Sequence, residues 1–152
     1  MARMQSSVVI NRPVEEVFAF VAAMENDSQW RLGIAEIGVT TPGPFAVGSE
    51  MREVLRFLGR TYVTTARCTA HEPHRRVAFR SLTGPQPVAG WRMVEPAAGG
   101  TRVTHALEAE PVGWLGRLTL PLQVAIMRRQ MRRESQRLKA LLEVGPAPDR
   151  IA

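Results

Sequence analysis

The stretch GGTRVTHALEAE, residues 99–110, opens with two glycines and continues in a strict alternation of side chains. His105 and Leu107 fall on one side of an extended chain, whereas Arg102 and Glu108 fall on the other. Because successive side chains of a strand point to opposite faces of its sheet, the pattern predicts a strand with one face toward the interior and one toward water. The pattern therefore places a titratable side chain, His105, in the inward set.

Extended runs of the same kind precede this strand, and short segments rich in glycine and proline, such as TGPQP and PAAGG, separate them. Such segments are typical of tight connections between antiparallel strands. No helical pattern interrupts the series. The sequence predicts an antiparallel meander with strands near residues 34–41, 48–58, 61–71, 76–83, 88–95 and 101–110.

Helices are expected before and after the meander. An extended run at 3–11 leads to Pro13, which favours a helix start, and VEEVFAFVAAM then repeats its apolar residues at helical spacing. The polar segment ENDSQWRLG, residues 25–33, is expected to form a loop or a second short helix. The last element is a long helix near 113–143, with a start or a kink at Pro121.

The long helix has an apolar face and an arginine-rich face when its residues are placed at 100° steps. We interpret the arginines of RRQMRRESQRLK, residues 128–139, as the solvated back of the helix, and binding to an anionic surface or a partner is the alternative. Glu134 lies on the apolar face, where it either reaches inward or pairs with an exposed arginine. The apolar face consists of Leu120, Val124, Met127, Met131, Leu138, Leu141 and Leu142.

Composition places the chain among ordinary globular proteins, with 45% hydrophobic and 22% charged residues and a net charge of +6. Its 152 residues suit one domain, which we expect over residues 1–145, followed by a frayed tail at 146–152. Cys68 is the only cysteine, so no disulfide can form within the chain, and a cytoplasmic location is expected. Neither a signal peptide nor a membrane span is predicted, because the longest apolar run, LTLPLQVAIM, is too short to cross a bilayer.

Five segments, VVINRPVEEVFAFVAAMENDSQW, VGSEMREVLRFLGR, HEPHRRVAFRS, VEPAAGGTRVT and RLKALLE, together resemble the START/Bet v 1-like (SRPBCC) superfamily, in particular its bacterial polyketide cyclase/dehydrase-like branch. The resemblance covers about residues 4–143. It implies an α+β helix-grip fold, in which a seven-stranded antiparallel curved sheet wraps around the long C-terminal helix, with two short N-terminal helices and an apolar cavity. It also implies one of two functions: binding of a hydrophobic lipid, polyketide or aromatic molecule, or cofactor-free cyclase, aromatase or dehydratase chemistry.

Inward-facing strand residues and the apolar helix face are expected to line the cavity. Apolar walls with a few polar groups are typical of small-molecule sites. Tyr62 is able to donate a hydrogen bond to a ligand carbonyl, although a core tyrosine is the alternative, and Trp30 is either a core residue or a lid at the entrance. The predicted ligand-binding residues are Trp30, Met51, Leu55, Phe57, Tyr62, Phe79, Met127 and Met131.

Three polar residues are the candidates for acid–base catalysis. A neutral imidazole at His105 is suited to proton transfer, and a hydrogen-bonded core histidine is the alternative. Glu53 shares the inward parity of its strand and needs a partner if it is buried, for which Arg92 is the candidate. The pattern leaves open whether Arg92 or Trp91 faces inward, and only the VEP motif of the resemblance favours Arg92.

Motifs for other chemistry are missing from the sequence. The HEPH of residues 71–74 contains a proline and lacks the HExxH spacing, so it is interpreted as a turn and not as a metal site. No cofactor or nucleophilic-hydrolase motif is present, and Cys68 is expected to be buried and inert. We therefore expect a monomer or homodimer that uses no metal or cofactor, binds a hydrophobic small molecule and does not bind nucleic acid.

Overall fold

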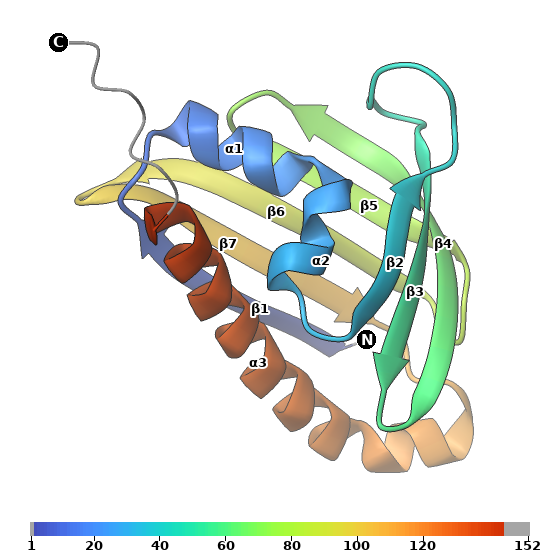
Figure 1. Ribbon diagram of the computed structural model, residues 1–152. Helices are drawn as coiled ribbons and strands as arrows, with labels where there is room; N and C mark the ends of the chain where they lie inside the picture. The colour runs from blue at the N-terminus through green and yellow to red at the C-terminus, as the bar shows by residue number, and fades with distance from the viewer. Residues whose placement is uncertain (1, 145–152) are drawn as a thin grey trace, which may run out of the picture.

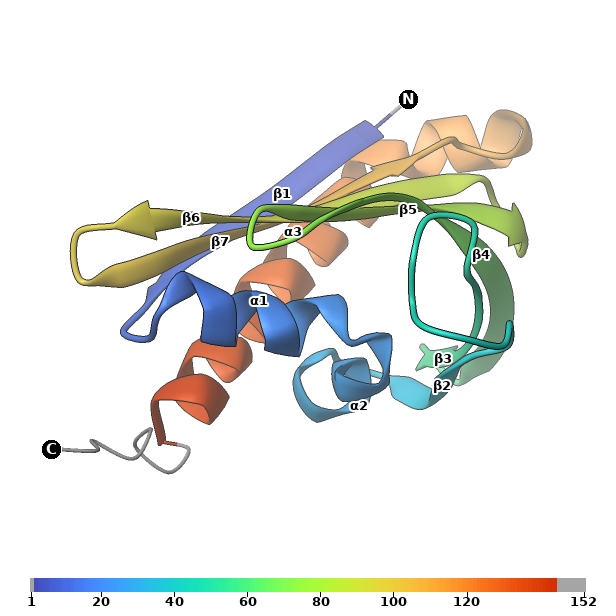
Figure 2. The same ribbon diagram turned by 90° about the horizontal axis from the view of Figure 1, so that it is seen from above.

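The computed structural model describes residues 2–144 of the chain. Seven antiparallel strands form one curved sheet in the order β1-β7-β6-β5-β4-β3-β2, and α1 and α2 lie on its concave side (Figures 1 and 2). This sheet, the long C-terminal helix and the two short N-terminal helices confirm the predicted fold class; the tail predicted at 146–152 lies outside the described residues. The elements are β1 (Ala2–Ile10), α1 (Val14–Ala22), the 3-10 turn η1 (Met24–Asn26), α2 (Asp27–Trp30), β2 (Ile34–Val39), β3 (Glu50–Phe57), β4 (Arg60–Glu72), β5 (Arg76–Thr83), β6 (Val88–Ala97), β7 (Gly100–Ala109) and α3 (Gly113–Val144).

Strand register decides which side chains face the concave side. His105 on β7 pairs with Arg92 on β6, so these two side chains project from the same face, and both are buried. Trp91 projects from the convex face, where its register partners are Ala78 and Ala106. The alternation therefore directs Arg92 inward and Trp91 outward.

The turn between β6 and β7 explains the two glycines that precede the strand. Gly100 has a φ of +136°, and a Cβ atom at this position would lie 2.0 Å from the carbonyl oxygen of Ile10. Any larger residue would therefore collide with the backbone at the end of β1. Glycine here allows β1 and β7 to pair along their whole length.

The concave face of β1, β7 and β6 is covered by helices. The second half of α3 docks on the edge strand β1, where Ser135 Oγ and Ser6 Oγ lie 2.9 Å apart and Lys139 Nζ donates to the Val9 carbonyl at 2.7 Å. α1 adds its apolar face to the same layer. The buried residues of this core include Ile10, Val17, Val21, Met24, Trp30, Val77, Val94, Val103 and Leu138.

The first half of α3 has different surroundings. It extends past the ends of β1 and β7, so that little of the sheet covers it (Figures 1 and 2). The helix begins at Gly113, and Pro121 is an interior residue. Because proline has no N–H, one helical hydrogen bond is missing at this position.

Candidate functional site

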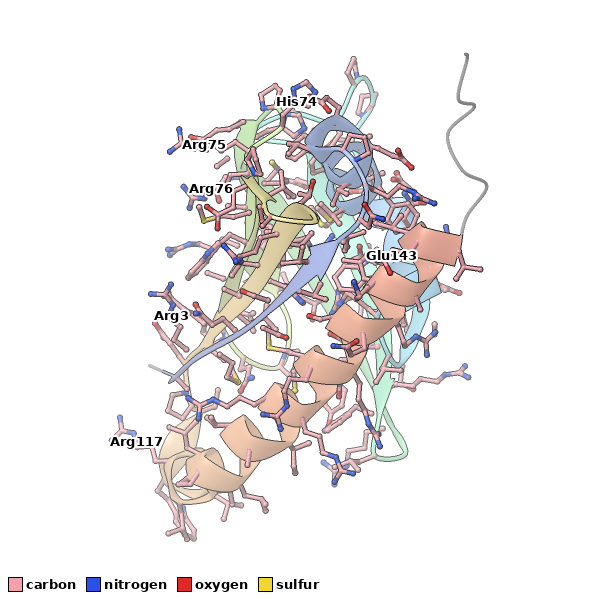
Figure 3. The ribbon with its side chains drawn as sticks, turned by 90° about the vertical axis from the view of Figure 1, so that its left-hand side faces the viewer. Arg3, His74, Arg75, Arg76, Arg117 and Glu143 are labelled. Atoms are coloured by element: carbon pink, nitrogen blue, oxygen red, sulfur yellow. The ribbon has the colours of Figure 1, made fainter. Side chains whose placement is uncertain are left out.

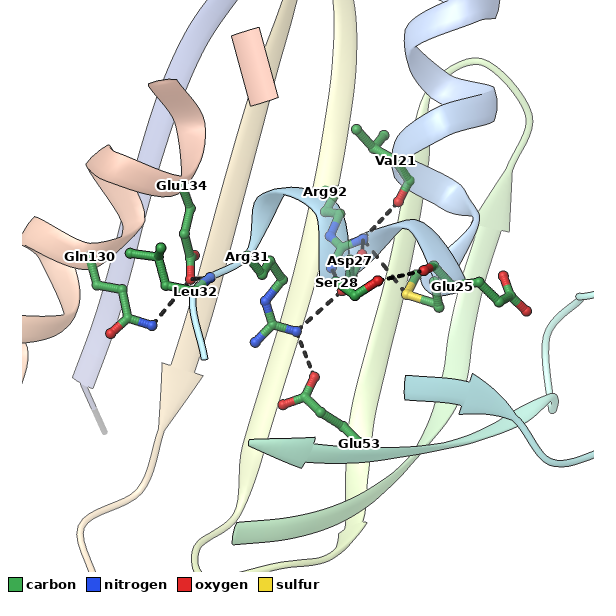
Figure 4. Close-up of polar contacts among 11 residues, drawn as sticks. Val21, Glu25, Asp27, Ser28, Arg31, Leu32, Glu53, Arg92, Gln130 and Glu134 are labelled. Carbon is green, nitrogen blue, oxygen red and sulfur yellow. Dashed lines mark hydrogen bonds and ion pairs between the residues drawn. The ribbon is translucent and has the colours of Figure 1, made fainter. Parts of the chain in front are cut away.

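A buried ion pair lies at the centre of the helix-covered part of the sheet. Arg92 donates to both carboxylate oxygens of Asp27, at 2.8 and 2.5 Å, and to the carbonyl of Val21 at 2.7 Å (Figure 4). Both charged side chains are only 1% exposed. Removing either partner would leave the other charge buried and unpaired, so this bidentate contact fixes α2 to β6.

Arg31 extends this pair into a chain of charges. Its Nη1 atom lies 3.2 Å from Asp27 Oδ2 and 2.6 Å from Glu53 Oε2 (Figure 4). Burial alone would lower the pKa of Arg31, but the carboxylates of Glu53, Asp27 and Glu134 outweigh it and raise the pKa above its ordinary value. Glu53 therefore pairs with Arg31, and the expected partnership of Glu53 with Arg92 is wrong, because Asp27 occupies Arg92.

His105 is enclosed beside this chain of charges. Its ring packs edge-on against Trp30, with a centroid distance of 5.4 Å, and the side chain is 2% exposed. Burial first, and then the positive charges of Arg92 and Arg31, hold the pKa of His105 well below its ordinary value. Its Nδ1 atom has no hydrogen-bond partner among residues 2–144. The imidazole is therefore neutral at pH 7, and a substrate reaches it only if the packing around Trp30 opens.

Glu134 of α3 has a structural role. Its Oε1 atom accepts from the backbone N–H of Leu32 at 3.0 Å and from Gln130 Nε2 at 3.1 Å (Figure 4). The side chain is buried, and within residues 2–144 its hydrogen bonds come from Leu32 and Gln130 and not from an arginine. Glu134 therefore points inward and does not pair with an exposed arginine, and it connects the long helix to the segment between α2 and β2.

The eight predicted ligand-binding residues divide into two groups. Trp30, Met51 and Met131 are buried in the packed interior. The other five are half-buried on the concave side of the sheet or the inner side of α3: Leu55, Phe57, Tyr62, Phe79 and Met127. We call these five residues, together with Leu107, the open part of the concave face. An enclosed apolar cavity is not shown by residues 2–144.

The strands bring the open part together in register. Leu55 pairs with Tyr62 across β3 and β4, and Phe79 and Leu107 both pair with Gly90. A Cβ atom at Gly90 would lie 2.7 Å from the ring of Phe79 and 2.9 Å from Leu107. Because Gly90 has no side chain, Phe79 and Leu107 close over it, and the apolar surface continues from β5 to β7.

A separate groove of about 590 Å³ lies along α3, where Leu32 of the segment between α2 and β2 meets the helix. It contains none of the predicted site residues, and four of its six lining residues are arginines. Its lining residues are Leu32, Arg129, Arg132, Arg133, Gln136 and Arg137.

The described residues contain neither a metal-binding cluster nor a membrane-spanning helix. Between Ala2 and Val144, no group of histidine, cysteine and acidic side chains is arranged to hold a metal ion. No helix in the same range has the length and apolar character needed to cross a bilayer.

Sequence reasoning missed two residues of the buried network, Asp27 and Arg31. Both lie in the polar segment that was expected to be a loop or a short helix, and they flank Trp30. The available signal was that Asp27 and Arg31 are four positions apart with Trp30 between them, because this spacing places both charges on one side of a helical turn.

Comparisons with known proteins agree with this fold. The family model described as "Polyketide cyclase / dehydrase and lipid transport" matches residues 1–143. No curated protein is significantly similar to the chain in sequence.

Three solved structures illustrate the similarity. The protein TTHA0849 from Thermus thermophilus has 17% identity and a TM-score of 0.82, covering 96% of this chain and 100% of its own. A START superfamily protein from Mycobacterium smegmatis has 14% identity and a TM-score of 0.75, with 93% and 97% covered. The Zhui aromatase/cyclase from Streptomyces sp. R1128 has 16% identity and a TM-score of 0.73, with 93% of each chain covered. At these identities the likeness establishes the helix-grip fold alone.

Proposed function

The chain belongs to the polyketide cyclase/dehydrase and lipid transport family, and on that premise we propose that it binds a hydrophobic small molecule against the open part of the concave face. The observation that carries this proposal is the half-buried apolar surface formed by Leu55, Phe57, Phe79, Leu107 and Met127. Apolar side chains that gather on one concave surface without being fully covered gain free energy when a ligand removes them from water.

Polar groups border this surface and define the chemistry of the ligand. Tyr62 carries a hydroxyl, and it pairs in register with Leu55. Glu53 pairs with Thr64 further along the same strands, and its carboxylate, bonded to Arg31, is 20% exposed. A flat or elongated apolar molecule with one carbonyl or hydroxyl group therefore suits the surface best.

Cyclase, aromatase or dehydratase activity is the second candidate, and the Glu53–Arg31 pair favours it, because 20% of the Glu53 side chain is exposed. Sequence reasoning assigned the proton transfers to His105, Glu53 and Arg92. Arg92 and His105 are buried in the packed part, whereas Glu53 borders the open part. In this candidate Glu53 is the group with access to substrate, and His105 contributes only after an opening motion.

A fluorescence titration with the uncharged probe N-phenyl-1-naphthylamine tests the binding proposal. We expect saturable binding, and we expect Leu55→Gln and Met127→Gln each to weaken it by roughly tenfold, because a polar side chain replaces apolar contact area. Val63→Gln and Met93→Gln are matched controls, since both residues are exposed and lie on the convex face. Equal losses in all four variants, or no saturable binding by a folded protein, would contradict the proposal.

Turnover of a linear poly-β-ketone distinguishes the second candidate from binding alone. Glu53→Gln is expected to abolish conversion to a cyclised or dehydrated product while the probe still binds. Conversion that is unchanged in Glu53→Gln would exclude Glu53 as the proton-transfer group.

A further inference from the structure

The outer side of the first half of α3 exposes large apolar side chains. Trp114 is 76% exposed, Leu118 is 70% exposed and Leu122 is 64% exposed. Their spacing of four residues places them along one face of the helix, and Leu115 and Ile126 border them. We call these five residues the apolar row. A monomeric protein rarely leaves such a contiguous apolar surface in water, so the row indicates a partner surface.

Arginines continue the same outer face along the second half of the helix. Arg129, Arg132, Arg133 and Arg137 line the surface groove on α3. No ion pair between Ala2 and Val144 involves any of these four arginines, although Arg137 donates to the carbonyl of Gln29 at 3.4 Å. We call these four residues the arginine row.

Charge is one-sided along this whole part of the chain. From Pro111 to Arg133 there is no acidic residue, whereas Arg117 near the helix start adds a further positive charge (Figure 3). A second copy of the chain would set the arginine row against the partner's arginine row if the two helices paired in parallel, or against its apolar row if they paired antiparallel, and neither arrangement supplies a counter-charge. The complementary surface must therefore offer negative charge beside apolar groups.

We propose that the outer face of α3 docks on a membrane surface that contains anionic phospholipids. The apolar row enters the boundary between headgroups and acyl chains, with the Trp114 indole at headgroup level, as is usual for tryptophan at membrane interfaces. The arginine row binds lipid phosphates, to which guanidinium groups donate paired hydrogen bonds. Since the two rows follow one another along the axis, the helix lies inclined, with its beginning deeper than its end.

This docking does not depend on the proposed ligand, because the apolar row lies on the outer side of α3 and the open part lies on the concave side of the sheet. The two proposals therefore fail separately. Vesicle binding is measured without any small molecule, whereas probe binding is measured without vesicles.

Co-sedimentation with vesicles tests the docking surface. We expect the full chain to bind phosphatidylcholine vesicles that contain one-third phosphatidylglycerol at physiological salt. Its affinity for pure phosphatidylcholine vesicles should be lower by at least roughly tenfold. Leu118→Ser with Leu122→Ser is expected to reduce binding by roughly tenfold or more, because two apolar side chains no longer enter the interface. Arg129→Gln with Arg133→Gln is expected to give a loss of similar size.

Matched controls keep the test independent of folding and of total charge. Val63→Ser with Leu82→Ser removes two exposed apolar residues of the sheet, and Arg52→Gln with Arg67→Gln removes two exposed arginines. Both controls should bind vesicles as the unmodified protein does, and all variants should keep its circular dichroism spectrum.

Three outcomes would overturn the proposal. One is equal binding to both kinds of vesicle or to neither. Another is full binding by Leu118→Ser with Leu122→Ser, which would leave only a nonspecific charge effect. The third is a stable dimer in sedimentation velocity that dissociates in this same variant, which would make a second copy the occupant of the apolar row.

Discussion

The concave face of one sheet has two parts that differ in what covers them. In the part beneath α2 and the second half of α3, the charged side chains Arg92, Asp27 and Glu134 are buried, and each of them is hydrogen-bonded. In the open part, apolar side chains such as Leu55 and Phe79 remain half-buried. The buried charged residues therefore stabilise the fold, whereas the half-buried apolar residues of the open part have surface that a ligand is able to cover.

Asp27→Asn should give the largest loss of stability. The substitution keeps the shape of the side chain but leaves Arg92 buried without its counter-charge, so we expect the free energy of unfolding to fall by about 3–5 kcal/mol. Urea denaturation of both proteins measures this difference.

Glu50, which pairs with Arg67 on the exposed surface of the same sheet, provides the matched control for removing the carboxylate of Asp27. Glu50→Gln should cost less than about 1 kcal/mol, because solvent screens this pair. If Asp27→Asn is no more destabilising than Glu50→Gln, the helix-covered part is not held by its charges.

Met131 and Met127 compare the two parts on one helix, one turn apart. Met131 is fully buried, so Met131→Ala should lower the free energy of unfolding by about 2–5 kcal/mol. Met127 is half-buried, so Met127→Ala should cost clearly less while weakening binding of N-phenyl-1-naphthylamine. Equal destabilisation by the two variants in urea would remove the distinction between the packed and open parts.

The pH dependence of stability tests the enclosure of His105. The pKa of His105 is lowered in the folded state, so the unfolded chain binds a proton near pH 6.5 that the folded protein does not bind. This site should therefore leave stability unchanged above that pH and reduce it below, by up to about 1.4 kcal/mol per pH unit, until the folded pKa is reached.

Denaturation at pH 6.5 and pH 5.5 measures that slope. His105→Gln should remove this contribution, because glutamine does not titrate, and the slope of the variant should be smaller than that of the unmodified protein. Identical slopes would show that the imidazole is accessible to protons in the folded state.

Tyr62→Phe should have the smallest effect on stability, within about 0.5 kcal/mol, because the residue is half-buried and its hydroxyl forms no hydrogen bond with any of residues 2–144. Binding of a ligand that carries a carbonyl should weaken by about 0.5–1.5 kcal/mol, the net value of one hydrogen bond. Isothermal titration with a carbonyl-bearing and a hydrocarbon analogue separates the two effects, since only the first should respond.

Local patterns predicted the strands and helices, and the family resemblance implied how they are arranged. Alternation in residues 99–110, together with the turn residues between the runs, predicted the antiparallel meander, because strand parity is a property of neighbouring residues. The same reasoning could not decide the phase of β6. Trp91 is more apolar than Arg92, yet it packs on the convex face between Ala78 and Ala106.

The network around Arg92 depended on contacts that no local pattern contains. Asp27 lies 65 residues from Arg92 in sequence and belongs to a polar segment, so its burial follows only from the docking of α2 on β6. The exposure of Trp114 and Leu118 has a similar cause. Helical periodicity identifies the faces of α3, but it does not show that the first half of the helix extends past the ends of β1 and β7.

Methyl NMR of the protein labelled at its methionine methyl groups shows whether a ligand binds the open part or the packed part of the concave face. The methionines sample each region: Met127 lies at the open part, Met24 lies beside Arg92 in the packed part, and Met93 lies on the convex face. On addition of N-phenyl-1-naphthylamine, we predict that the Met127 signal shifts most while the Met24 and Met93 signals stay in place. A shift of the Met24 signal as large as that of Met127 would show instead that the ligand enters the packed part around Arg92 and His105.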